Sequence, residues 1–215
     1  MTNKKVAVFW DWNGTIVNDS LLFVDIMNVF LLEKKLNAIS VDDYKRFFEF
    51  PIKNYYLNLG FDFKDESFES LGRRFIKEYT SRQYDARLFP GIRRLLINLK
   101  QKNCLQFVVS AQENSLLQRA VFYYKVDSYF SSFVGVSNIF AKGKVGLAIS
   151  LYKQFLDPSY DVFLVGDTMH DIEVARSINA TPVLVSYGHC DKEKLFNSGE
   201  IVVDSVLELS LFFLR

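Results

Sequence analysis

The chain has 215 residues, of which 49% are hydrophobic and 24% are charged, and its formal net charge is +1. This composition supports a packed core and excludes a largely disordered chain, and the near-neutral charge gives no basis for a nucleic-acid-binding surface. Cys104 and Cys190 lack the spacing of a metal or redox motif, so a reduced, cytoplasmic protein is expected. Asp25 and Asn28 interrupt the most apolar stretch, residues 21–32, so no membrane span is expected.

Short apolar segments, rich in Val and Phe, alternate with helical patterns along most of the chain. The expected strands are residues 5–11, 105–111, 133–136, 161–167, 181–187 and 201–203. Near-continuous hydrophobic runs of this length are typical of strands that are buried on both faces, as in a parallel sheet. The expected helices between them are residues 91–103, 114–125, 144–155 and 171–179. This alternation predicts an α/β fold with a doubly wound, Rossmann-like parallel sheet.

Residues 18–85 break the alternation, because they carry helical patterns and no convincing strand. Residues 19–36 are apolar nearly all round and are expected to be buried against another part of the chain, and Ser40 and Asp43 have the spacing of a capping box. We therefore expect a small all-helical cap at residues 18–85, inserted after the first strand. The α/β core would then consist of residues 1–17 and 86–215, with the cap over the carboxyl end of the first strand.

Side chains suited to catalysis follow the predicted strands of the core. Asp11 ends the first strand, Ser110 the second and Asp167 the fourth. Asp171 follows Asp167 by four residues, and Lys144 opens the helix after the third strand. Ligands of an open parallel sheet bind outside the carboxyl ends of the strands, so we expect these side chains to converge at one edge.

Three carboxylates at one site need positive charge beside them, because like charges raise one another's pKa. Lys144 supplies one positive charge, and a hard divalent cation such as Mg²⁺, which also prefers phosphate oxygens, would balance the rest. Ser110, Lys144 and the turn amides near Asn13 and Gly14 could together hold a phosphate group. Asp11 would then be placed to attack phosphorus and form an aspartyl phosphate.

Four motifs in this order resemble those of the haloacid dehalogenase superfamily. They are DWNGT at 11–15, VVSA at 108–111, AKGKVGLA at 141–148 and VGDTMHDIEVA at 165–175. The last motif and SYGH at 186–189 are similar to the phosphoglycolate-phosphatase-like branch. The resemblance implies a Mg²⁺-dependent phosphatase that acts on a small phosphorylated metabolite. The similarity to this branch suggests phosphoglycolate as the substrate. The protein is expected to be a monomer or a weak homodimer.

The resemblance also implies a role for individual residues. The expected catalytic residues are Asp11 as nucleophile, Asn13, Ser110 and Lys144. The expected metal ligands are Asp11, the backbone carbonyl of Asn13, Asp167 and Asp171. The expected phosphate contacts are Asn13, Gly14, Ser110, Ala111 and Lys144, with Lys142 as the alternative to Lys144.

Asn13 departs from the family pattern, in which phosphatases carry an aspartate that exchanges protons with the leaving group and the attacking water. An asparagine can do neither, so general acid–base catalysis worth about 10²–10⁴-fold should be lost, while metal and phosphate binding should survive. We therefore expect a preference for good leaving groups, such as acyl or aryl phosphates, and accumulation of the phosphoenzyme. His170 is a candidate substitute for the missing group, although a surface or supporting role is the simpler interpretation of His170 and His189.

Three alternatives differ in chemistry. Phosphonate hydrolases cleave a carbon–phosphorus bond, and their first motif is similar to this one in its Asp-Trp pair. They also need a lysine from the cap. A degenerate member would bind phosphorylated ligands or a partner without turnover. A receiver-type domain is disfavoured, because its acceptor aspartate does not end the first strand and no helical cap follows.

Overall fold

The computed structural model of the protein describes residues 5–137 and 143–214. Lys142, the alternative phosphate contact, lies outside the described residues. Within the described part of the chain, none of the helices has the length and apolar character needed to cross a membrane.

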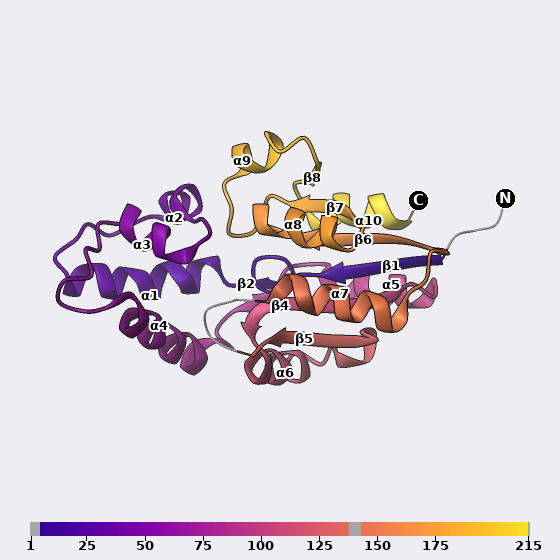
Figure 1. Cartoon of the computed structure of the whole chain (residues 1–215), viewed down its shortest axis with the longest axis horizontal. Coiled ribbons are helices and arrows are strands. Elements are labelled where there is room, and N and C mark those ends of the chain that lie inside the picture. Colours follow the sequence, from indigo (N-terminus) through magenta and orange to yellow (C-terminus); the bar gives the residue numbers. More distant parts are fainter. Residues whose placement is uncertain (1–4, 138–142, 215) are drawn as a thin grey trace.

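A six-stranded sheet in which all neighbouring strands run parallel forms the centre of the core (Figure 1). Across the sheet the order is β5 (Ser132–Val136), β4 (Leu105–Glu113), β1 (Lys5–Trp10), β6 (Tyr160–Gly166), β7 (Thr181–Val185) and β8 (Ile201–Val203). Trp10 of β1 pairs with Val108 of β4 on one side and with Val165 of β6 on the other. The predicted parallel sheet is confirmed, and the strands that end near Asp11, Ser110 and Asp167 are direct neighbours.

Helices cover both faces of the sheet, which explains the continuous hydrophobic runs. Val8 and Trp10 of β1 belong to one hydrophobic cluster with α5 (Ile92–Gln101), α6 (Asn114–Tyr123) and α10 (Val206–Leu214). Ala7 and Phe9 belong to a second cluster with α7 (Lys144–Phe155) and α8 (Met169–Ser177). All four of these β1 side chains are fully buried. A further short helix, α9 (Lys192–Phe196), lies between β7 and β8 in the chain.

Four helices leave the core at one end of the molecule, and we call them the helical insertion. They are α1 (Ser20–Glu33), α2 (Val41–Phe47), α3 (Ile52–Asn58) and α4 (Phe68–Arg82). Two short antiparallel strands, β2 (Val17–Asn18) and β3 (Arg87–Leu88), form the neck through which the chain leaves and returns. The insertion has a hydrophobic cluster of its own, which includes Phe30, Tyr44 and Leu71.

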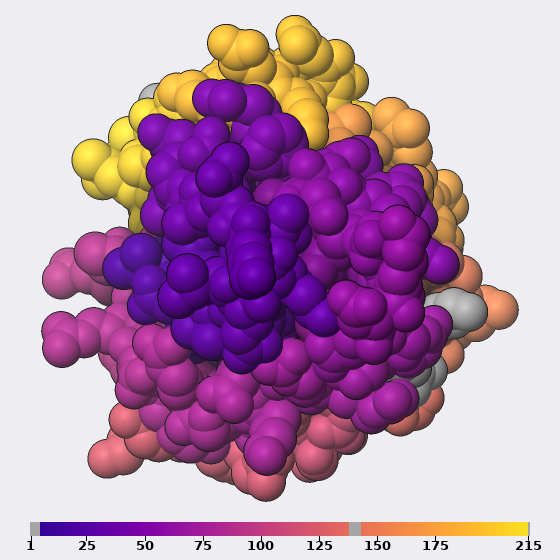
Figure 2. Space-filling model, turned by 90° about the vertical axis from the view of Figure 1, so that its left-hand side faces the viewer, coloured from indigo at the N-terminus to yellow at the C-terminus, as the bar shows by residue number. Residues whose placement is uncertain are grey.

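The carboxyl end of β1 faces the helical insertion (Figure 1). From outside, the insertion occupies the middle of that end of the molecule, with parts of the core visible around its rim (Figure 2). Ligands that bind at this edge of the sheet therefore lie between the core and the insertion.

Local sequence signals explain part of the insertion. The predicted capping box is confirmed, since the Asp43 N–H donates to Ser40 Oγ (3.1 Å) and the Ser40 N–H donates to Asp43 Oδ2 (3.1 Å). Helix α3 was not predicted, because Pro51 and Gly60 indicate chain breaks; they lie just outside the two ends of this seven-residue helix.

The expectation that α1 is buried against another part of the chain is confirmed, but the burial is on one side only. Leu21, Val29 and Leu32 are exposed, although Phe30 and Leu31 beside them are buried. The helix is apolar all round, but it packs only its inner face against the rest of the insertion.

Candidate active site

Three carboxylates meet where β1 and β6 end. Asp11 follows β1, Asp167 follows β6, and Asp171 lies in the first turn of α8. Each offers one oxygen atom to a cluster in which these atoms lie within 4.8 Å of one another, and all three residues are buried. The structure thus brings together the three acids that the sequence predicts to converge at this edge of the sheet.

Lys144 is the cation that faces these acids. Its Nζ lies 2.8 Å from Asp11 Oδ1 and 2.6 Å from Asp171 Oδ1, and its side chain is only 3% exposed. Burial alone would lower the pKa of Lys144, but the Asp11 and Asp171 carboxylates outweigh it and raise that pKa above its usual value. Lys144 is therefore a permanent positive charge between two carboxylates.

One lysine does not balance three acids. Burial is the main factor that raises the pKa of Asp11 from 3.8 to about 7, against the attraction of Lys144 and with the repulsion of Asp171. Burial likewise raises the pKa of Asp167, although His189 opposes the shift. For Asp171, burial is again the largest effect, but Lys144 and the hydrogen bonds from Thr168 outweigh it and lower the pKa.

The donor set fits a divalent cation. A cluster of buried carboxylate oxygens with an excess of negative charge is what a hard ion such as Mg²⁺ requires. Burial and the neighbouring carboxylates raise the pKa of Asp11 and of Asp167, and a bound cation would offset both effects.

Glycine at two turns makes room for Asp167. Gly14 has a φ of +71°, and a Cβ there would lie 2.2 Å from Asp167 Oδ2. A Cβ on Gly188 would lie 2.3 Å from the same oxygen. The close approach lets the His189 N–H donate to Asp167 Oδ2 (2.6 Å) and Thr15 Oγ1 donate to Oδ1 (3.2 Å). Asp167 is therefore held by neighbours on both sides.

Among the residues expected to contact phosphate, Ser110 and Ala111 lie on β4, and Gly14 lies in the turn after β1. Ser110 is buried near the end of β4, beside β1, and its Oγ accepts a hydrogen bond from the Gln112 N–H (3.0 Å). Ala111 follows it in the same strand, where the register to β5 shifts. The Gly14 N–H donates to Asp19 Oδ1 (3.1 Å) and to the Val17 carbonyl (2.9 Å), so this amide is already engaged within the chain.

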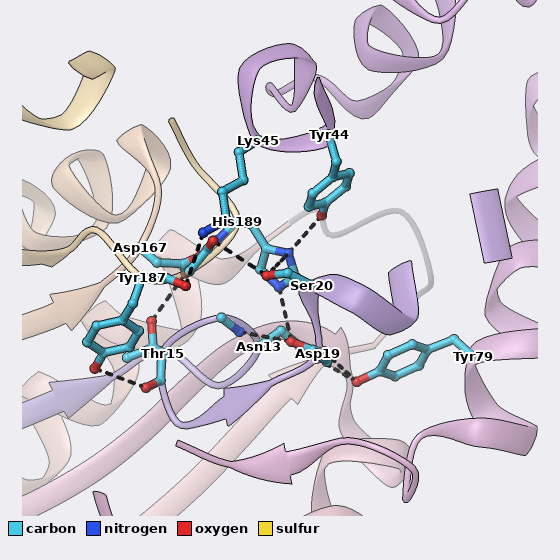
Figure 3. A network of polar contacts seen from close by, with 12 residues as sticks. Asn13, Thr15, Asp19, Ser20, Tyr44, Lys45, Tyr79, Asp167, Tyr187 and His189 are labelled. Carbon is cyan, nitrogen blue, oxygen red and sulfur yellow. Dashed lines mark hydrogen bonds and ion pairs between the residues drawn. The ribbon is translucent and has the colours of Figure 1, made fainter. Parts of the chain in front are cut away.

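Asn13 lies in a buried network that the sequence did not reveal (Figure 3). Its Nδ2 donates to Asp19 Oδ2 (2.6 Å) and to the Tyr79 hydroxyl (2.7 Å), which in turn donates to Asp19 Oδ2 (2.8 Å). Asp19 is fully buried. In the sequence, Asp19 looks like an ordinary helix-capping residue before α1, and Tyr79 comes 60 residues later, so only the folded chain connects them to Asn13.

His189 extends this network to a second helix of the insertion. Its Nε2 lies 3.1 Å from Asp19 Oδ1, and its Nδ1 lies 2.7 Å from the Tyr44 hydroxyl (Figure 3). Burial alone would lower the pKa of His189, but the carboxylates of Asp19, Asp167 and Asp11 together outweigh it and the net shift is upward. His170 instead contacts Glu173 on its own helix, Nδ1 to Oε2 at 2.9 Å, and no hydrogen bond joins it to Asn13 among the described residues.

Comparisons with known proteins agree with this architecture. Residues 8–185 match the family model for haloacid dehalogenase-like hydrolases. The chain is 23% identical to a phosphoglycolate phosphatase from Caulobacter vibrioides over 210 residues, which cover 94% of this chain and 88% of that protein. It is 26% identical to an N-acetylmuramic acid 6-phosphate phosphatase from Pseudomonas putida over 220 residues, 94% of this chain and 93% of that protein. A crystal structure of a predicted phosphatase from Clostridium acetobutylicum has the same fold, with a TM-score of 0.80 at 20% identity and 99% of each chain covered.

Replacing Lys144 should destabilise the protein strongly. Lys144→Met leaves buried carboxylates without their cation, and breaking a buried ion pair in this way costs about 3–5 kcal/mol of unfolding free energy. Urea unfolding in the presence of a chelator measures the change. The matched control is Lys153→Met on the exposed side of the same helix, which should stay within about 0.5 kcal/mol of the unaltered chain. Equal losses of unfolding free energy in the two variants would contradict the role of Lys144 as the cation that neutralises these carboxylates.

The stability of the metal-free protein should depend on pH through Asp11. Because the pKa of Asp11 in the folded chain is raised from 3.8 to about 7, the native state binds the proton more tightly than the unfolded chain does. The free energy of unfolding should therefore fall as the pH rises from about 4 to about 7. Unfolding curves with chelator at several pH values test this, and Asp11→Asn should flatten the slope. An unchanged slope in Asp11→Asn would show that another group is responsible.

Proposed function

Because the chain belongs to the haloacid dehalogenase-like hydrolase family, we propose that it is a Mg²⁺-dependent phosphatase of a small phosphorylated metabolite. The observation that carries the proposal is the buried cluster of Asp11, Asp167, Asp171 and Lys144 at the carboxyl edge of the sheet. Phosphoglycolate is the first substrate to test, since one relative is a phosphoglycolate phosphatase.

Asp11 is the proposed nucleophile. Its Oδ1 is held by Lys144, which leaves Oδ2 to attack the phosphorus atom of the substrate. The new Oδ2–phosphorus bond forms as the bond from phosphorus to the ester oxygen breaks, and the leaving group departs with the electron pair. Water then attacks phosphorus, the bond to Asp11 breaks, and inorganic phosphate is released while the carboxylate is restored.

The other residues hold charge and orientation during these steps. Lys144 and Ser110 would contact the phosphoryl oxygens, and Ala111 offers its backbone N–H beside them. Asp11, the Asn13 carbonyl, Asp167 and Asp171 would hold Mg²⁺. When bound, this ion neutralises charge on the phosphoryl oxygens and so makes phosphorus approachable by a carboxylate.

Asn13 sets the chemical limit of the proposed enzyme. An amide neither protonates a departing alkoxide nor removes a proton from water, so both steps proceed without a proton-transferring side chain at this position. Substrates whose leaving groups are stable as anions are turned over well, and poor leaving groups are not.

We also propose that residues 18–85 act as a cap on a core formed by residues 1–17 and 86–215. Polar contacts join the two parts above the site: Lys45 Nζ donates to the Tyr187 carbonyl (3.3 Å), and Lys194 Nζ donates to the Arg46 carbonyl (2.7 Å). A cap in this place would exclude water during the first step and select the substrate.

Phosphate release should require Mg²⁺ and the Asp11 carboxylate. We expect activity on a panel of acyl, aryl and alkyl phosphates to be lost with chelator and in Asp11→Asn, while the exposed control Asp65→Asn retains it. Mg²⁺ should also raise the unfolding free energy, by about 2.7 kcal/mol at 100 times its dissociation constant, and Asp167→Asn should abolish this gain. Full activity of Asp11→Asn would contradict the proposal. Mg²⁺ stabilisation without any turnover would favour a non-catalytic binding protein.

The rate should depend steeply on the leaving group. Without a general acid, alkyl phosphates should react more slowly than aryl or acyl phosphates by about 10²–10⁴-fold. Rapid-quench kinetics with an aryl phosphate should show a burst, because hydrolysis of the phosphoenzyme also lacks a base. A rate that is independent of leaving-group pKa, or the absence of a burst, would mean that another residue supplies the proton transfers.

A further inference from the structure

We propose that Asp19 and Tyr79 are positioning residues that hold the Asn13 amide in one orientation, with its Oδ1 available to accept a hydrogen bond from the water that hydrolyses the phosphoenzyme. This inference rests on the proposed phosphatase function and deepens it, because it assigns a task to an asparagine that cannot transfer protons.

The orientation of Asn13 follows from the chemistry of its partner. The Asn13 NH₂ group donates to Asp19 Oδ2 at 2.6 Å, so the donor branch of the amide faces the carboxyl group. The Tyr79 hydroxyl receives the second hydrogen of this group at 2.7 Å. Both donors of the amide are thus used, and Oδ1, on the other branch of the amide, points away from Asp19. No hydrogen bond to Oδ1 is seen among the described residues.

Asp19 itself is unsuited to replace the missing base. Its Oδ2 accepts hydrogen bonds from Asn13 and Tyr79, and its Oδ1 accepts one from the Gly14 N–H (3.1 Å) and faces His189 Nε2 at 3.1 Å. Four polar neighbours occupy the four lone-pair positions of the carboxylate, and the residue is fully buried. All lone pairs of the Asp19 carboxylate therefore face hydrogen-bond partners within the protein. Asp19 orients these partners and has no lone pair left to accept a hydrogen bond from water.

Tyr79 connects the orientation of the Asn13 amide to the helical insertion. It lies on α4 of the helical insertion, where its ring packs edge-on against Phe23 of α1 at 5.2 Å between ring centres. Asn13 belongs to the core turn that follows Asp11. A contact from the insertion therefore fixes a side chain two residues from the proposed nucleophile (Figure 3).

The consequence concerns the second chemical step. The oxygen of water forms a bond to phosphorus, the bond from phosphorus to Asp11 breaks, and its electron pair returns to the carboxylate. The proton that water loses leaves on the released phosphate. Asn13 Oδ1 takes no proton; it accepts a hydrogen bond that aligns water with phosphorus. The first step, attack by Asp11, does not use this hydrogen bond.

The hydrogen bond between Asn13 and Asp19 also predicts how substitutions at the two positions affect each other. In Asp19→Asn, an NH₂ group turned toward the backbone N–H of Gly14 would bring two donors together, so the new amide turns its oxygen to Gly14 and its NH₂ group to Asn13. Asn13 must then flip and present NH₂ where Oδ1 was. In the double variant Asn13→Asp with Asp19→Asn, the complementary pair is restored with donor and acceptor exchanged, and a carboxylate oxygen again faces the water.

The test separates the two steps by rapid quench, with an aryl phosphate and Mg²⁺. Asp19→Asn should slow phosphoenzyme hydrolysis by at least about tenfold and change its formation by less than about twofold. Tyr79→Phe removes one of the two hydrogen bonds of the Asn13 NH₂ group, so it should slow the same step by a smaller factor. The double variant should recover hydrolysis to at least the rate of the unaltered chain. Tyr56→Phe is the matched control, since it removes another buried hydroxyl of the insertion, one that packs among Phe61 and Phe68 away from Asn13 and Asp19, and it should leave the ratio of the two rates unchanged.

Equal slowing of both steps, or no slowing, in Asp19→Asn and Tyr79→Phe would overturn the inference and leave the proposed function standing. Failure of the double variant to recover would also overturn it. Absence of any phosphoenzyme in the unaltered chain would overturn the proposed function together with the inference. Should Asp19→Asn fail to fold, the milder Tyr79→Phe and its control decide the outcome.

Discussion

The arrangement of the site depends on one buried lysine between two buried carboxylates. Lys144 contacts Asp11 and Asp171 at once, and these residues come from the ends of three different elements: β1, α7 and α8. The ion pairs tie these elements together at the carboxyl edge of the sheet. They also leave an excess of negative charge, because one lysine faces three buried carboxylates. A site with this imbalance is suited to bind a divalent cation and, through it, a phosphate group.

The core and the helical insertion contribute different things. The core supplies the charged groups and holds them rigidly, because Asp167 is fixed from two turns and Asp171 accepts hydrogen bonds from the Thr168 N–H (3.0 Å) and hydroxyl (2.8 Å). The insertion supplies two tyrosine hydroxyl groups that form hydrogen bonds beside the carboxyl edge of the sheet. Tyr44 and Tyr79 lie on different helices, yet both meet the Asp19–His189 pair. The helical insertion is therefore joined by hydrogen bonds to the Asp19–His189 pair beside the proposed site.

The parts that could be predicted from the sequence are those with a local signal. The buried strands carry continuous hydrophobic runs, and Asp11 and Asp167 come directly after two of them, so strand order alone brings them to one edge. Lys144 could be predicted in the same way, because it begins a helix that follows a strand. The capping box at Ser40 needs only four residues to be recognised.

The rest lacked such a signal for physical reasons. The hydrogen bonds of Asn13 to Asp19 and Tyr79 join a turn, a helix start and a distant helix, and nothing in the local sequence of any of them indicates the others. The exposed face of α1 carries Leu21, Val29 and Leu32 in addition to Asp25 and Glu33, so the apolar residues alone do not distinguish it from the buried face.

The central claim is that Asp11 carries the phosphoryl group during turnover. The most direct measurement is an acid quench of the unaltered protein while it turns over an aryl phosphate with Mg²⁺, followed by mass-spectrometric mapping of its peptides. The account predicts a phosphoryl group on the peptide that contains Asp11, attached to that carboxylate. Steady turnover with an unmodified Asp11 peptide, or with the phosphoryl group on another residue, would contradict it.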